Sequence, residues 1–170
     1  MGLIKPSKGT ILIDGIPTDN EEFLPFVSYV PQQPFLFNST ILENITMGKG
    51  AHVDYDYIDL LCEKLGLTEA MNSLPNGYDT EIQHESLRFS GGQKQRLSIV
   101  RVLYSKPQLL ILDEATNQQN SMLEQHIFSF LKELTEKEKM SIISVSHTKN
   151  TEGFYTQSFK LEDKKLKAIG

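Results

Sequence analysis

The sequence is poor in cysteine and lacks long apolar runs, and both shortages limit what the protein can be. Cys62 is the single cysteine, so neither an intrachain disulfide nor a cysteine-based zinc site can be built, which fits a reducing compartment. No segment approaches the ~20 apolar residues that a membrane-spanning helix needs. No signal peptide is expected, because the start carries no apolar core behind basic residues. Any membrane role would therefore pass through another segment or another chain.

Positive charge is also scarce. The 17 Lys and Arg residues are outnumbered by 22 Asp and Glu residues, which gives a formal net charge of -5. Nucleic acids and anionic membrane surfaces bind basic stripes, so this balance argues against both as main partners. With 39% apolar residues in 170, the chain can form a compact domain with a real core.

The apolar pattern predicts an α/β fold. Strands are expected at 10–15, 27–30, 109–112 and 141–146, and a hairpin is expected around Asp163-Lys164. Helices are expected over 41–45, 58–65 and 123–134, and after an N-cap at Ser90. The two later apolar runs suit strands that are buried in a parallel sheet, because a helix separates them. The stretch from about 34 to 105 is expected to form a helical insert or subdomain.

Two adjacent acids, Asp113 and Glu114, follow the apolar run at 109–112. Ligands bind at the carboxyl edge of parallel strands. There, one carboxylate can hold the hydration shell of Mg²⁺ and the next can poise a water for attack on a phosphate. Strands also often end in solvated acids, so this pair alone leaves both interpretations open.

A serine and two glycines open the helix that begins near residue 90. Ser90, Gly91 and Gly92 are followed by Gln93. Such a helix start offers N–H groups and a positive dipole end to an anion, and glycine lets a phosphate approach the backbone closely. An ordinary capped helix with a glycine turn would have the same sequence, so this motif also leaves two interpretations open.

The order of these motifs resembles the ABC ATPase family. Phe89-Ser90-Gly91-Gly92-Gln93 is similar to its LSGGQ signature motif, and the segment ending in Asp113-Glu114 is similar to its Walker B strand. The stretch 29–34 (YVPQQP) resembles the Q-loop, with Gln32 at its glutamine, and Ser146-His147 resembles the switch histidine. Segments 40–45 and 74–80 are similar to exporter-type members, and the likeness covers nearly the whole chain.

The resemblance implies a P-loop NTPase-like α/β fold with a parallel sheet core and a helical subdomain. On this basis 1–33 would hold N-terminal strands and the Q-loop, 34–105 the helical subdomain, and 106–170 the remaining core. The resemblance also implies roles for the motif residues. Glu114, His147 and Gln32 would surround the attacking water. Asp113 and Gln32 would help to bind Mg²⁺. The residues of the signature motif would bind ATP that is held mainly by an opposite domain; these are Ser90, Gly91, Gly92 and Gln93.

Two departures from the family pattern stand out. The P-loop pattern is absent from these residues: the only Gly-Lys pair is Gly48-Lys49, with Gly50 where Ser or Thr belongs and Glu43 where the first glycine belongs. In the family this loop lies just upstream of the segment that resembles residues 2–6. We therefore expect an N-terminally truncated domain with weak nucleotide binding. Asn120 also stands where the family's D-loop usually has an aspartate.

The expected function is that of an ATP-binding and ATP-hydrolysing motor domain that drives a membrane transporter. The expected partners are a second ABC domain and a transmembrane domain, at the cytoplasmic face of the cell membrane. The alternative is a non-catalytic half-domain that donates its signature motif to an intact partner. A soluble member of the superfamily acting in DNA repair or translation is disfavoured by the acidic balance and the exporter-like Glu43-Asn44-Ile45.

Overall fold

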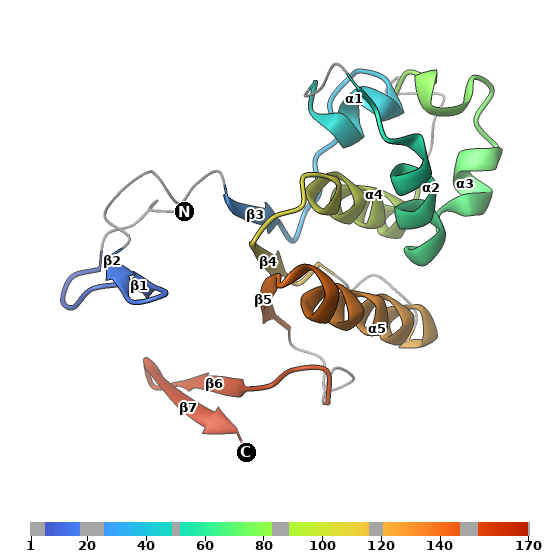
Figure 1. Ribbon diagram of the computed structural model, residues 1–170. Helices are drawn as coiled ribbons and strands as arrows, with labels where there is room; N and C mark the ends of the chain where they lie inside the picture. Colours follow the sequence, from blue (N-terminus) through green and yellow to red (C-terminus); the bar gives the residue numbers. More distant parts are fainter. Residues whose placement is uncertain are drawn as a thin grey trace.

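A computed structural model describes residues 6–17, 26–48, 52–82, 89–115, 121–146 and 153–169. Its centre is a three-stranded parallel sheet in the order β3-β4-β5 (Figure 1). The strands are β3 (Val27–Val30), β4 (Leu109–Asp113) and β5 (Ser141–Val145). Helix α5 (Ser121–Glu138) connects β4 to β5, which confirms the predicted strand–helix–strand unit. The predicted α/β fold class is confirmed.

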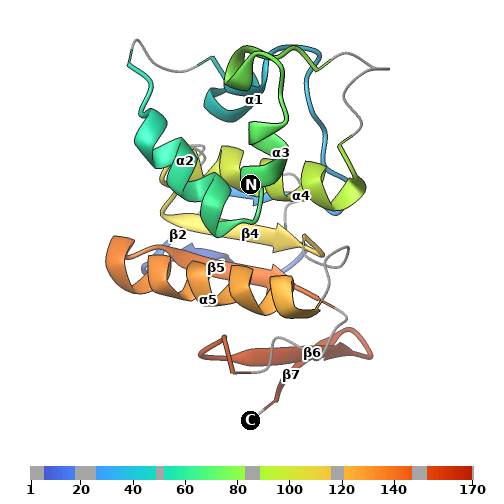
Figure 2. The same cartoon turned by 90° about the vertical axis from the view of Figure 1, so that its right-hand side faces the viewer.

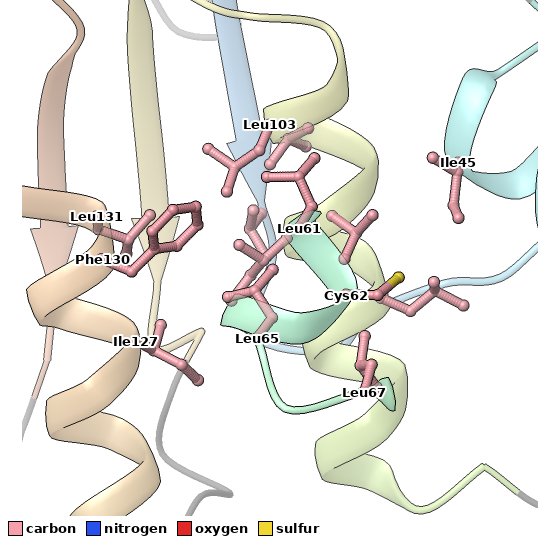
Figure 3. Close-up of a cluster of buried hydrophobic side chains, with 14 of the residues drawn as sticks. Ile45, Leu61, Cys62, Leu65, Leu67, Leu103, Ile127, Phe130 and Leu131 are labelled. Atoms are coloured by element: carbon pink, nitrogen blue, oxygen red, sulfur yellow. The ribbon is translucent and has the colours of Figure 1, made fainter. Parts of the chain in front are cut away.

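The helices gather on one side of this sheet (Figure 1). They are α1 (Ile41–Thr46), α2 (Tyr55–Lys64), α3 (Thr68–Asn72), α4 (Gly91–Tyr104) and α5, with a short 3-10 helix η2 (Gly77–Asp79). Figure 2 shows α5 lying along β5. In Figure 3, leucines of α2 and α4 meet the apolar face of α5. The core therefore lies between the sheet and α2, α4 and α5.

A glycine ends the turn after α2. Gly66 has φ +63, and a Cβ at this position would lie 3.1 Å from Leu123 Cδ1 on α5. Both the left-handed backbone and the close approach therefore favour glycine here. The residue allows the helical region that contains α2 to pack tightly against α5.

The sheet is covered on one face only by the described residues. Leu110 and Leu112 on β4 are buried, whereas Ile143 and Val145 on β5 are 54% and 49% exposed. Alternate side chains of a strand point to opposite faces, and the helices pack on the face that holds Leu110 and Leu112. The strand predicted at 141–146 is confirmed over Ser141–Val145, but the prediction that this strand is buried is wrong. The corresponding prediction for β4 holds only for the face with Leu110 and Leu112, since Ile111 on the other face is only partly buried.

Two hairpins lie beside this core. β1 (Leu12–Ile13) pairs with β2 (Ile16–Pro17), and β6 (Ser158–Glu162) pairs with β7 (Lys165–Ile169). Asp163 and Lys164 both have positive φ, as a two-residue hairpin turn requires, so the predicted C-terminal hairpin is confirmed.

In the part of the chain that the structure describes, every helix is too short or too polar to cross a membrane.

Candidate functional site

The acid that follows β4 has an unusual backbone conformation. Glu114 has φ +49, in the left-handed region that residues with a side chain rarely adopt. Its N–H donates to the carbonyl of Val145 at 2.9 Å, and its own carbonyl accepts from Gln95 Nε2 at 3.1 Å. Strand β5 and helix α4 therefore both anchor the backbone of Glu114.

Gln32 lies directly against the carboxylate of Glu114. Its Nε2 donates to Glu114 Oε2 at 2.7 Å. Gln32 comes two residues after β3, and Glu114 comes one residue after β4. Because parallel strands end at the same edge of a sheet, the two side chains meet there. The structure thus brings together two of the residues that the sequence predicts for one site.

Asp113 has a partner that the sequence analysis missed. The hydroxyl of Tyr29 donates to Asp113 Oδ2 at 2.8 Å. This hydrogen bond, together with partial burial and the charge of Asp113, raises the pKa of Tyr29 above its ordinary value. The signal available in the sequence was strand alternation: Tyr29 pairs with Ile111, two residues before Asp113, and so shares its face of the sheet.

The glycine-rich motif forms the first turn of α4. Ser90 Oγ accepts from the N–H of Gln93 at 3.2 Å, and Gln93 Oε1 accepts from the N–H of Ser90 at 2.8 Å. This reciprocal capping box confirms the predicted N-cap. Gly91 and Gly92 follow without side chains, at the positive end of the helix dipole. Gln93 differs from the expectation in one respect, because its side chain carbonyl is already bonded within the cap.

A half-buried arginine ties the segment after Gln32 to the helices. Arg101 on α4 donates to the Asn44 carbonyl at 2.7 Å, to Asn44 Oδ1 at 2.8 Å and to the Phe35 carbonyl at 2.8 Å. Its guanidinium also lies 5.2 Å from the ring centroid of Phe37. The loop that carries Gln32 is thus joined to the helix that begins at Ser90.

Several predicted residues lie outside the described part of the chain. These are His147, Lys49, Gly50 and the stretch 117–120 that contains Asn120. The proposed proximity of His147 to Glu114 stays a prediction. Within the described ranges, no group of three or more His, Cys, Asp or Glu side chains could hold a metal ion.

The model of the family described as ABC transporter matches residues 1–117, more than half of the 170 residues. The chain belongs to the ABC transporter family. The match includes the Gln32 loop, the Ser90 helix start and the Asp113-Glu114 pair. The motif order that the sequence indicates is therefore that of an ABC ATP-binding domain.

Relatives of this ABC domain are transporters, some of them named as exporters. The chain is 34% identical over 164 residues to the ABC multidrug transporter mdr4 of Aspergillus fumigatus, covering 94% of this chain and 12% of that protein. It is 37% identical to the putative export ATP-binding/permease protein RT0691 of Rickettsia typhi, covering 84% of this chain and 25% of that protein. A bacterial Atm1-family ABC exporter solved with ATP bound matches with a TM-score of 0.73 and 34% identity, covering 86% of this chain and 26% of the exporter. The chain thus spans a minor part of each relative.

Proposed function

We propose that this ABC domain serves in an ATP-hydrolysing motor that couples hydrolysis to export across a membrane. The observation that carries the proposal is the 2.7 Å contact between Gln32 Nε2 and Glu114 Oε2 at the carboxyl edge of the sheet. A carboxylate and an amide held together there can accept a proton from a water and orient it. The exporter relatives supply the class of reaction that such a site would drive.

The motif residues would divide the catalytic work between them. Glu114 would take the proton of the attacking water, and Gln32 would hold the carboxylate in place and help to orient that water. Ser90, Gly91 and Gly92 would present helix N–H groups and a hydroxyl to the terminal phosphate of ATP bound mainly by an opposing domain. His147 would contact the same phosphate, as the resemblance implies.

The oxygen donors at the site suit Mg²⁺ bound with a nucleotide. Mg²⁺ prefers hard oxygen ligands and usually binds through one or two carboxylates, waters and substrate phosphates. Asp113 Oδ2 accepts from Tyr29, which leaves Oδ1 to accept from the metal's water shell, and Gln32 offers its Oε1. When bound, Mg²⁺ would neutralise charge that develops on the phosphates.

To test the motor role, the P-loop pattern that is absent from these 170 residues is added to the chain. A P-loop strand and helix from the Atm1-family exporter would be joined upstream of residue 1. We expect the fusion to hydrolyse ATP, and Glu114→Gln to lower kcat by about 10²-fold to 10⁴-fold, the range lost with a general base. Glu133→Gln, an exposed acid on α5 paired with Lys137, is the matched control. Equal rates for the Glu114 and Glu133 variants would reject the motor role.

A second function is supported by the intact capping box at Ser90, which keeps the start of the signature helix well formed. In that case the chain would offer the Ser90 helix start in trans to an intact ABC domain. Mixing the unfused chain with the ATP-binding domain of the Atm1-family exporter tests this. Stimulated hydrolysis that is lost with Ser90→Asp but kept with Glu114→Gln would support the donor role. The chain alone should show little or no ATPase activity.

The proposed partners are a second ABC domain and a transmembrane domain, with the chain at the cytoplasmic side of the membrane. Contact with the membrane would pass only through the transmembrane partner. We also propose that residues 34–105 act as the helical subdomain. Their link to the Gln32 loop through Arg101 supports this, because a movement of either part would be passed to the other.

A further inference from the structure

A buried glutamine lies inside the helix that begins with the signature motif. Gln95 on α4 is 1% exposed. Its Nε2 donates to the carbonyl of Glu114 at 3.1 Å, whereas its Oε1 is buried without a hydrogen-bond partner among the described residues. Burying an amide with half of its capacity unused is unfavourable compared with an apolar side chain of the same size. Packing alone therefore does not account for a glutamine here.

The group that Gln95 contacts is the one with the unusual backbone. Glu114 has φ +49, which is disfavoured for any residue that carries a Cβ. Such a conformation persists only where the surrounding contacts fix it. The carbonyl of Glu114 is held by Gln95 and its N–H by Val145, so α4 and β5 fix the peptide groups on either side of its Cα.

The chemistry of the contact requires a donor at position 95. A reversed amide would bring Oε1 against the carbonyl oxygen of Glu114, and two acceptors repel each other. An apolar side chain would leave that carbonyl without this donor. A glutamine amide therefore suits the position for a reason that is separate from its volume.

We propose that Gln95 is a positioning residue that holds Glu114 in its left-handed conformation and so aims its carboxylate at Gln32. Gln95 lies about one turn after Gly91, the first residue of α4, so the same helix carries both the Ser90 turn that would face the phosphate and the donor to Glu114. A shift of the first turn of α4 at Ser90 would then move Glu114. The catalytic meaning of this link rests on the proposed function, but the link itself is a property of the chain.

The test follows the side-chain amide of Gln32 by NMR in the 170-residue chain without nucleotide. Its resonance reports contact with the Glu114 carboxylate, and Glu114→Ala defines the position of the signal when the contact is lost. We expect Gln95→Met to move the signal at least half of the way there. The amide proton of Glu114 should also exchange about fivefold to tenfold faster, as expected for one lost hydrogen bond. Ser98→Ala, a buried polar position on the same helix, should leave both signals unchanged.

A folded Gln95→Met variant with an unmoved Gln32 signal would overturn the proposal. If this variant does not fold, hydrogen exchange in the unaltered chain tests the contact instead. The side-chain amide protons of Gln95 should then exchange at least tenfold more slowly than those of exposed Gln33. Equal exchange rates would reject the contact. Neither measurement uses ATP. If Glu114 proved to be unnecessary for ATP hydrolysis, the motor role would be contradicted, but the result on Gln95 would still hold.

Discussion

At the scale of single residues, the last residue of β4, Asp113, and the residue after it, Glu114, each accept a hydrogen bond from β3 or the loop that follows β3. Tyr29 donates to Asp113, and Gln32 donates to Glu114. Both donors come from β3 or the loop that follows it. The two carboxylates therefore have fixed and different orientations, which a site with one metal-facing acid and one water-facing acid requires.

Cys62 has no place in this chemistry, and its titration reports on the core instead. Burial on α2 is the main cause that raises the pKa of its thiol from 9.0 to about 11. The neutral thiol is therefore favoured by folding. The stability that it contributes is fully present below pH 9 and is lost as the pH rises from 9 to about 11, because the unfolded chain ionises first.

We expect Cys62→Ala to reduce the alkaline loss of stability. The free energy of unfolding of the unaltered chain should fall by about 1.4 kcal/mol more between pH 8 and pH 10 than that of the variant. Urea unfolding at the two pH values measures this. Iodoacetamide should also label the native thiol slowly, since the reactive species is the thiolate. Fast labelling at pH 8, or parallel pH curves for both chains, would contradict the burial of Cys62.

At the scale of the helix, the Ser90 cap combines a structural role with the proposed phosphate role, and two substitutions can separate them. Ser90→Ala should lower the free energy of unfolding by about 1 kcal/mol, because the N–H of Gln93 loses its acceptor. Ser90→Asp keeps an acceptor at the N-cap and adds favourable charge at the helix dipole.

The two variants should therefore differ in opposite directions in two assays. Ser90→Asp should match the unaltered chain in urea unfolding, yet its negative charge should repel phosphate and lower the stimulation of a partner ATPase by at least tenfold. Ser90→Ala should be less stable and keep more of that stimulation. If Ser90→Asp stimulated normally, the helix start would be a structural cap only.

The same scale shows what the sequence can and cannot predict. The ends of β3 and β4 were predictable as neighbours, because parallel strands separated by helices end at one edge. Gln95 was not, because it lies between Lys94 and Arg96 and nothing in that polar run indicates burial. The exposure of Ile143 was also missed, since an apolar run shows that a strand can be buried but not which of its faces a helix covers. Short elements such as α3 and η2 carry too few residues for a periodic pattern.

At the scale of the whole molecule, the described chain has a packed core and an exposed C-terminal hairpin. Phe154 and Tyr155 pack against Phe128 of α5, with ring centroids 5.8 Å apart in each pair. After these residues, the apolar side chains of β6 and β7 are exposed to solvent, and Leu161 is 70% exposed. The aromatic contact thus marks the last firm attachment of the chain to the core.

This division predicts unequal effects of similar substitutions. Leu110→Ala on β4 should lower the free energy of unfolding by about 2–5 kcal/mol, because its fully buried side chain leaves a cavity beneath α4 and α5. Leu161→Ala on β6 removes the same atoms from an exposed position and should change it by no more than about 0.5 kcal/mol. Urea unfolding followed by circular dichroism compares the two. Hydrogen exchange should agree, with the amides of β6 and β7 opening locally while those of β4 exchange only with global unfolding. A large loss of stability with Leu161→Ala would show that the hairpin is part of the cooperative core, and the attachment at Phe128 would then not be its boundary.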